Sequence, residues 1–285
     1  NTTEELCSRW YQAGTFYPFS RNHAAIDSNN HEPYALGPTL LATARASLYL
    51  RYAMLKHFYA LFLRANGTGT VFKPMFYEFP NENIFYNQSL DFVNTQYMIG
   101  SSLMVTPVLK EGVNYTLAYF PQSAWYELRE GALIRASNQT GAVLNVTSHL
   151  NETVPTFIRG GHLVAVQEVD NVLRTDDLNS NFLLLLALQY SNTVGTLRNY
   201  YASGPMIALQ DLNDSNIVTK CFSYNCVYNV MANFSYTPGG SYALALRFTL
   251  PNNNIGNEQV YVSGIRISGD WTSSQTEEFA LHATQ

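Results

Sequence analysis

The sequence predicts a multi-domain protein in which one β/α unit is followed by two β-rich stretches. Three observations lead to this prediction. Residues 16–23, Phe-Tyr-Pro-Phe-Ser-Arg-Asn-His, form an aromatic run that ends in polar side chains, and a helical pattern follows over residues 38–65. After Gly67 the helix signals give way to short strands separated by turn residues. A length of 285 residues also favours two or three domains over one.

The N-terminal elements follow from local signals. Thr2 or Thr3 followed by two glutamates predicts a helix start, and the helix is expected over residues 4–14. Aromatic and β-branched residues favour an extended segment over residues 15–22, which a polar loop separates from the next helix. That helix is expected over residues 38–65, with apolar side chains at three- and four-residue spacing and a stop at Asn66-Gly67. Polar groups at the end of a strand are typical of α/β barrel active sites.

The rest of the chain has the pattern of β-sandwich domains. Each expected strand combines β-forming residues with flanking turn residues. The expected strands cover residues 71–79, 100–109, 117–121, 125–128, 157–166, 182–190, 221–230, 242–250 and 260–267.

Composition excludes some classes of partner. Only 13% of residues are charged and the net charge is −5, so no basic surface for nucleic acid is expected. The longest aliphatic run, residues 182–188, is too short to cross a bilayer, and we expect no transmembrane segment in this chain. The scattered histidines and the cysteines have no zinc-site spacing, so we expect no metal site, and no cofactor is expected.

Asn-X-Ser/Thr sequons indicate passage through the secretory pathway, with a lysosomal or extracellular destination. Some of them are expected to remain unmodified. The glycosylation candidates are Asn1, Asn66, Asn87, Asn114, Asn138, Asn145, Asn151, Asn213 and Asn233.

The three cysteines are consistent with an oxidising compartment. Cys221 and Cys226 enclose four residues, a separation that can bridge a hairpin or a bulged turn, and we expect them to form a disulfide. Cys7 is the odd cysteine, and from its sequence alone it is either a buried thiol or half of a bond to another segment.

Several motifs together resemble glycoside hydrolase family 31. They are Glu4 to Gly14 with residues 16–23, Glu32-Pro33-Tyr34, Leu50-Arg51-Tyr52-Ala53-Met54-Leu55, Lys73-Pro74-Met75-Phe76 and Gly100 to Val108. The resemblance covers roughly the first 165 residues. Ser20-Arg21-Asn22-His23 is more similar to the branch with lysosomal acid α-glucosidase and brush-border maltase than to the glucosidase II branch, which tends to carry Arg-Ala-His.

The resemblance implies a fold and an activity. Residues 1–99 would be the C-terminal portion of a (β/α)8 (TIM) barrel, residues 100–170 a proximal β-sandwich and residues 171–285 a distal β-sandwich. The implied activity is that of a retaining, exo-acting α-glucosidase that removes terminal glucose from maltose, oligomaltosides or glycogen. In the family both catalytic aspartates precede the segment that matches Asn1, so no catalytic residue is expected in this chain. The N-terminal remainder of the enzyme, in the same precursor or as a separately processed chain, is the expected partner, and Cys7 would pair with a cysteine of that part.

The resemblance also assigns roles to residues. His23 would bind hydroxyl groups of the terminal glucose, because a neutral imidazole can donate and accept at once. Arg21 would hold a catalytic carboxylate in place, and Asn22 would anchor the backbone or loop. The aromatic residues Trp10, Phe16, Tyr17 and Phe19 are expected to pack in the core.

Carboxylates elsewhere in the chain are not expected to be general acids, and this applies to Asp27, Glu32, Glu78 and Asp91. Lys73 stands where the family commonly has arginine, and can supply only a point charge there.

Two alternatives remain open. One is a non-catalytic glycan-binding or assembly protein that retains the family fold. The other is an enzyme of the family with another substrate, either a glucosidase II-type enzyme that trims N-glycans or an α-xylosidase.

Overall fold

The fold is described from a computed structural model. It covers residues 2–64, 68–87, 89–136, 139–178, 182–207, 227–237, 242–249 and 262–269. The chain divides into two compact units. The first unit comprises Asn1–Tyr52, Val71–Pro121 and Gly141–Thr156, and the second comprises Ala53–Thr70, Gln122–Thr140 and Phe157–Gln285.

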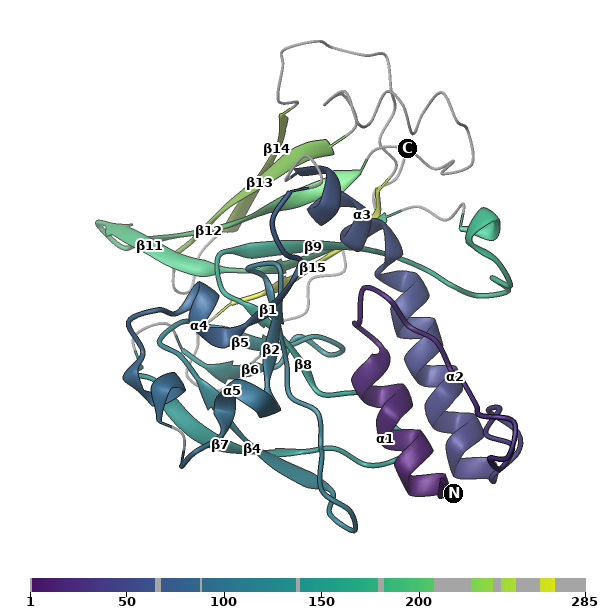
Figure 1. The fold of residues 1–285 in the computed structure, drawn as a ribbon. Helices are drawn as coiled ribbons and strands as arrows, with labels where there is room; N and C mark the ends of the chain where they lie inside the picture. Colours follow the sequence, from purple (N-terminus) through teal and green to yellow (C-terminus); the bar gives the residue numbers. More distant parts are fainter. Residues whose placement is uncertain are drawn as a thin grey trace. The chain divides into compact units, whose positions relative to one another are not determined.

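Helices α1 (Glu4–Gly14) and α2 (Pro38–Ala53) lie side by side in the first unit (Figure 1). The expected cap is present, because Thr3 Oγ1 accepts a hydrogen bond from Leu6 N at 3.1 Å. The buried face of α1 is polar: Arg9 Nη2 donates to Val113 O at 2.6 Å. Burial lowers the pKa of Arg9, opposed by the nearby charge of Glu5. A backbone carbonyl therefore accepts from one of the donors that α1 takes out of water.

The strands of the first unit are short. Strand β2 (Tyr97–Ile99) pairs antiparallel with β1 (Phe72–Pro74) and with β3 (Leu103–Val105). Strands β4 (Tyr115–Phe120) and β7 (Ala142–Thr147) form a separate antiparallel pair. Three short helices lie between β1 and β2 in the sequence: α4 (Met75–Glu78), the 3₁₀ helix η1 (Asn83–Tyr86) and α5 (Phe92–Thr95).

The strand expected over residues 71–79 is wrong beyond its first part. Pro74 cannot donate to a ladder, so β1 ends at this residue, which is also the N-cap of α4. Lys73 Nζ lies 2.5 Å from Glu78 Oε1, so the lysine found in place of the family's arginine forms an ion pair across this turn.

Within the residues that the structure describes, the second unit contains one α-helix, one 3₁₀ helix and most of the strands. The helix is α3 (Leu55–Arg64), and the 3₁₀ helix is η2 (Thr175–Asp177). The strands are β5 (Trp125–Glu127), β6 (Leu133–Arg135), β8 (Thr156–Arg159), β9 (His162–Gln167), β10 (Phe182–Ala187), β11 (Gln189–Val194), β12 (Leu197–Ile207), β13 (Val227–Tyr236), β14 (Tyr242–Thr249) and β15 (Val262–Ser268).

A seven-stranded sheet dominates this unit, with the order β14-β13-β12-β9-β10-β15 and β11 paired to β12. Its core face carries the apolar side chains of β9, β10, β12 and β13 and packs on α3. A smaller group forms where β5 pairs with β6 and β8. Gly160 and Gly161 divide the strand expected over residues 157–166 into β8 and β9, and Gly161 adopts a positive φ of 83°.

The helix expected over residues 38–65 is broken at Met54 into α2 and α3. The local sequence contains no glycine or proline at the break, so tertiary packing is the cause. Met54 is fully buried, and the buried Lys56 Nζ donates to Leu178 O at 3.2 Å. The contact boundary between the two units falls at the same place, between Tyr52 and Ala53.

Candidate functional site

The candidate site is built on the loop between α1 and α2, residues 15–37, here called the site loop. Two contacts fix the helices on either side of it. Glu4 Oε1, in the first turn of α1, accepts from Thr39 N at 2.8 Å and Leu40 N at 3.1 Å in the first turn of α2. A carboxylate at a helix N-terminus is favoured by the helix dipole. This contact therefore holds the N-terminal ends of α1 and α2 next to each other.

Arg51, near the other end of α2, holds the start of the site loop. Its Nη1 donates to Thr15 O at 3.0 Å and to Tyr17 O at 2.6 Å, and its Nη2 donates to Pro18 O at 3.4 Å. Burial lowers the pKa of this guanidinium, and Tyr52 opposes the shift. Because α1 and α2 start and end at the same levels, they run parallel, and the site loop returns along them. Parallel helices joined by a returning segment are the arrangement of successive units in an α/β barrel.

The strand expected over residues 15–22 is wrong, since no strand occurs there in the part of the chain that the structure describes. The carbonyls of Thr15, Tyr17 and Pro18 accept from Arg51 rather than from a neighbouring strand. A strand requires a ladder partner for its backbone groups, and side-chain donors replace it here.

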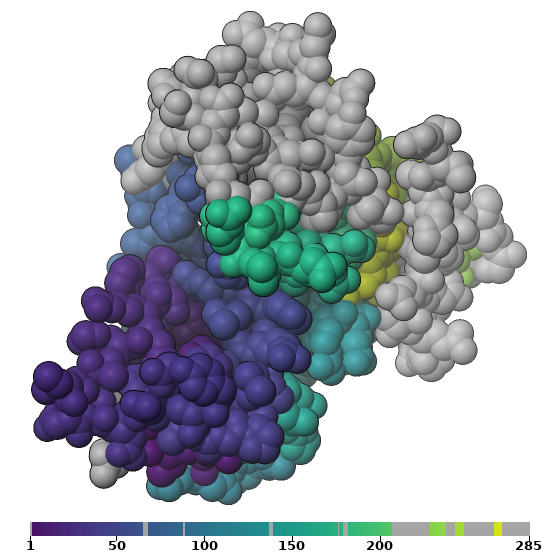
Figure 2. Space-filling view, turned by 90° about the vertical axis from the view of Figure 1, so that its right-hand side faces the viewer, coloured from purple at the N-terminus to yellow at the C-terminus, as the bar shows by residue number. Residues whose placement is uncertain are grey.

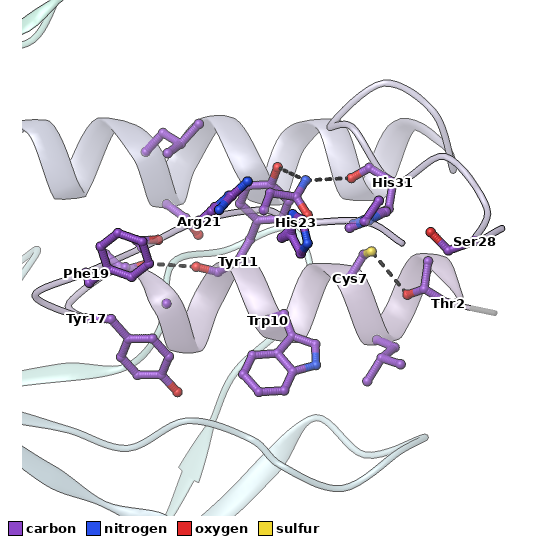
Figure 3. Close-up of a pocket in the computed structure, with 18 of the residues that line it drawn as sticks. Thr2, Cys7, Trp10, Tyr11, Tyr17, Phe19, Arg21, His23, Ser28 and His31 are labelled. Carbon is purple, nitrogen blue, oxygen red and sulfur yellow. Dashed lines mark hydrogen bonds between the residues drawn. The ribbon is translucent and has the colours of Figure 1, made fainter. Parts of the chain in front are cut away.

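Asn22 anchors the middle of the site loop, as the sequence predicts. Its Nδ2 donates to Tyr11 Oη and to His31 O, both at 2.9 Å. Burial raises the pKa of Tyr11, the hydrogen bond from Asn22 opposes this shift, and the charges of Cys7 and Glu32 add to it. Figure 3 shows Tyr11 on α1 and His31 on the site loop joined in this way.

A cavity of about 560 Å³ lies between the site loop and the two helices. Arg21, Asn22 and His23 all line it, and all three are exposed. Figure 3 shows the side chains of Tyr11 and Cys7 from α1 near those of Arg21 and His23 from the site loop, with the ring of Trp10 on the other side of α1 in this view. In the space-filling view, the purple N-terminal residues, which include α1 and the site loop, form one continuous surface (Figure 2).

Two aromatic residues differ from the sequence prediction. Phe16 is fully buried, as expected of core packing, whereas Trp10 is 62% exposed and Phe19 is 79% exposed. Both line the cavity. The spacing of aromatic residues in the sequence gave no signal for this, because an aromatic run looks alike whether its rings pack inward or face a cavity.

The cavity lining suits recognition rather than acid–base chemistry. It offers an imidazole, a guanidinium, an amide and aromatic rings, which can hydrogen-bond hydroxyl groups and stack on an apolar face. Among its described lining residues there is no aspartate or glutamate. The described residues also contain no group of three or more histidine, cysteine, aspartate or glutamate side chains placed to hold a metal ion.

The cysteines and sequons are only partly described. Cys7 is buried, forms no disulfide within the described residues, and lies 3.2 Å from Thr2 Oγ1 through its Sγ. Cys221 and Cys226 lie outside the described residues, as do the sequons at Asn1, Asn66, Asn138 and Asn213. The other sequon asparagines are exposed: Asn87, Asn114, Asn145, Asn151 and Asn233.

In the part of the chain that the structure describes, no helix has both the length and the apolar character that a membrane span requires.

Two family models match the chain. Residues 1–61 match the TIM-barrel domain of glycosyl hydrolases family 31, and residues 68–164 match the C-terminal domain of the same family. Together these models cover more than half of the chain, and they meet close to the change from helices to strands.

Related proteins extend the match. The chain is 39% identical over 245 residues to the lysosomal acid alpha-glucosidase of Tetrahymena pyriformis, covering 81% of this chain and 25% of that protein. It is 30% identical over 295 residues to the lysosomal alpha-glucosidase of Bos taurus, covering 99% of this chain and 30% of that protein. The chain thus spans less than a third of the length of these relatives.

Solved structures agree on the fold. The Tris-bound glucosidase II alpha subunit superposes with a TM-score of 0.66 at 23% identity, covering 99% of this chain and 30% of that one. A GH31 dextranase of Flavobacterium johnsoniae complexed with glucose superposes with a TM-score of 0.64 at 20% identity, covering 84% of this chain and 28% of that one. The chain carries the end of the TIM barrel and the β-rich C-terminal region of this architecture, and it belongs to glycoside hydrolase family 31.

Proposed function

We propose that this chain is the C-terminal part of a retaining, exo-acting α-glucosidase, in which His23 binds hydroxyl groups of the terminal glucose. The observation that carries the proposal is the exposure of Arg21 and His23 to one cavity on a loop that Arg51 and Asn22 hold in place. The named relatives are α-glucosidases, which supports the same activity here.

The chemistry requires groups that the cavity lining does not offer. In a retaining glycosidase one carboxylate attacks the anomeric carbon, while a carboxylic acid protonates the leaving oxygen and later takes a proton from water. We place both groups in the part of the enzyme that lies outside this chain. The chain itself covers 25% and 30% of the lengths of the two relatives. Arg21 would then hold one of these carboxylates ionised through a charge-assisted hydrogen bond.

The proposal extends to organisation and compartment. Residues 1–99 would complete the barrel, and residues 100–170 and 171–285 would form a proximal and a distal β-sandwich. Lysosomal relatives and the sequons support passage through the secretory pathway and a lysosomal or extracellular destination. Disulfides between Cys221 and Cys226, and between Cys7 and the remainder of the enzyme, belong to the same proposal.

The test is His23→Ala in the complete enzyme, with kcat/KM measured on maltose and on a chromogenic α-glucoside. We expect a loss of about 2–4 kcal/mol in transition-state stabilisation, as for a hydrogen bond made in a preorganised site. His149→Ala is the matched control, because His149 is an exposed histidine outside the cavity lining. An unchanged kcat/KM for His23→Ala would refute the binding role, and absence of α-glucosidase activity in the complete wild-type protein would refute the proposed function.

A further inference from the structure

We propose that Asn233 carries an N-linked glycan whose first sugar packs against Tyr201 on the exposed face of the seven-stranded sheet. The inference rests on the proposed passage through the secretory pathway. It is carried by the placement of one sequon in strand β13, in the middle of a surface that has the shape and chemistry to hold a sugar ring (β12, β13 and β14 in Figure 1).

The sequon in β13 is divided between the two faces of the sheet. Side chains alternate along a strand, so Asn233 and Ser235 share one face and Phe234 points to the other. Phe234 is 1% exposed and belongs to the apolar core, whereas Asn233 is exposed. The core therefore fixes the orientation of the strand and directs the acceptor amide away from it.

The neighbours of Asn233 are small residues on one side and a tyrosine in the paired position on the other. Asn233 is paired with Tyr201 of β12 and with Ala245 of β14, and Ser235 is paired with Ala243. Directly opposite residues in antiparallel strands have Cβ atoms about 5 Å apart. Small alanine side chains thus border Asn233 toward β14, and Tyr201 lies opposite Asn233 on β12, where the outer part of its ring extends toward Gly161.

A cavity of about 340 Å³ occupies this position. Its lining includes Asn199, Tyr201, Asn233, Ser235, Ala243 and Ala245. Tyr201 is 44% exposed, so its ring can contact the apolar face of a sugar, while Asn199 and Ser235 can hydrogen-bond hydroxyl or acetamido groups. An aromatic platform with flanking amide and hydroxyl groups suits the sugar that a neighbouring asparagine would carry.

The modification requires a lipid pyrophosphate-linked oligosaccharide as donor. A bond forms between Asn233 Nδ2 and the anomeric carbon of the first sugar. The bond from that carbon to the pyrophosphate oxygen breaks, the lipid pyrophosphate leaves, and the amide nitrogen loses one proton. Nothing is oxidised or reduced.

Asn145 provides a matched comparison. It is also an exposed sequon asparagine in a β-strand, but its partner across β4 and β7 is Leu117, an aliphatic residue. A glycan at Asn145 therefore lacks an aromatic ring directly opposite, and its first sugar should be more accessible than that at Asn233.

The first experiment measures site occupancy in the complete enzyme secreted from eukaryotic cells, by enzymatic deglycosylation and peptide mass spectrometry. We expect the Asn233 peptide to be occupied. Occupied sequons elsewhere with an empty Asn233 would overturn the inference while leaving the secretory assignment intact. No occupied sequon at all would overturn both.

The second experiment measures the rate at which a peptide amidase releases each glycan from the native enzyme. Release from Asn233 should be slower than release from Asn145, and Tyr201→Ser should speed release at Asn233 by about fivefold, the scale of one aromatic stacking contact. Tyr201→Phe keeps the ring and should retain the slow release, and Tyr77→Ser, at an exposed tyrosine of α4, should leave release from Asn233 unchanged. Equal release rates from Asn233 in wild type and in both Tyr201 variants would overturn the packing contact.

Discussion

The site loop and the seven-stranded sheet are held by different kinds of interaction. The site loop is largely exposed, and its conformation depends on hydrogen bonds from a few side chains, chiefly Arg51 and Asn22, to backbone groups and to Tyr11. The sheet is held by backbone ladders and by a core of fully buried apolar side chains. A substitution in the site loop should therefore affect activity more than the free energy of unfolding. A substitution of a buried residue in the second unit should affect the free energy of unfolding more than activity.

The largest effect is expected from pH acting on His57 in the second unit. This histidine of α3 is buried, and burial lowers its pKa from 6.5 to about 4, with the charge of His162 adding to the shift. Between these two values the unfolded chain binds a proton that the folded chain does not, so stability falls as pH decreases from 6.5 to about 4 and no further below that. The loss from this one group is about 3 kcal/mol.

The measurement is the free energy of unfolding of the complete enzyme at pH 7.5, 5.5 and 4. The variant His57→Gln removes the titrating imidazole and should flatten the decline. The exposed His149→Gln serves as control and should leave the decline as it is. An identical pH dependence in wild type and in His57→Gln would show that the second unit does not sense pH through this residue.

The same contrast explains which features the sequence could predict. Helix α1 was predicted with its boundaries, because Thr3 and the two glutamates after it act within one turn. Many strands also overlap an expected range, since alternation and turn residues are local signals, whereas β2, β6, β7 and β12 fall outside every expected range. The strand predicted at residues 15–22 is absent, and carbonyls of this segment accept from Arg51, which is more than thirty positions away in the chain.

The site could be predicted only in part for the same reason. The motif Ser20-Arg21-Asn22-His23 identified the candidate residues through a family resemblance, and the structure brings Arg21 and His23 to one cavity. The supporting role of Arg51 and the exposure of Trp10 had no local signal. Both depend on how α1 and α2 pack, and the break at Met54 depends on packing in the same way.

Arg51→Met is expected to have the next largest effect, this time on the site. It removes the donors to the carbonyls of Thr15, Tyr17 and Pro18 while retaining much of the aliphatic stem. The start of the site loop would then lose its position relative to α2. The transition-state stabilisation calculated from kcat/KM of the complete enzyme should fall by about 2 kcal/mol. Arg51→Lys should recover part of this loss, because it retains a charge but not the fork of donors.

Arg45→Met is the control for that change, since Arg45 is an exposed arginine of the same helix. Its activity should match wild type. A large fall in the unfolding temperature of Arg51→Met alongside the loss of activity would show that the site loop contributes to global stability. The proposed difference between the site loop and the seven-stranded sheet would then be refuted.

The smallest effect is expected at Asn22, where the anchor is exposed and water can replace its hydrogen bonds. Asn22→Ala removes the hydrogen bonds to Tyr11 Oη and His31 O. The transition-state stabilisation calculated from kcat/KM should fall by about 1 kcal/mol, with little change in the free energy of unfolding. Tyr11→Phe removes only the first of these bonds, so the two substitutions define a double-mutant cycle. If the bond between Asn22 and Tyr11 positions the loop, the double variant should lose less activity than the sum of the single variants. Strict additivity would mean that His31 O alone holds Asn22, and the link from α1 to His23 would then not pass through Tyr11.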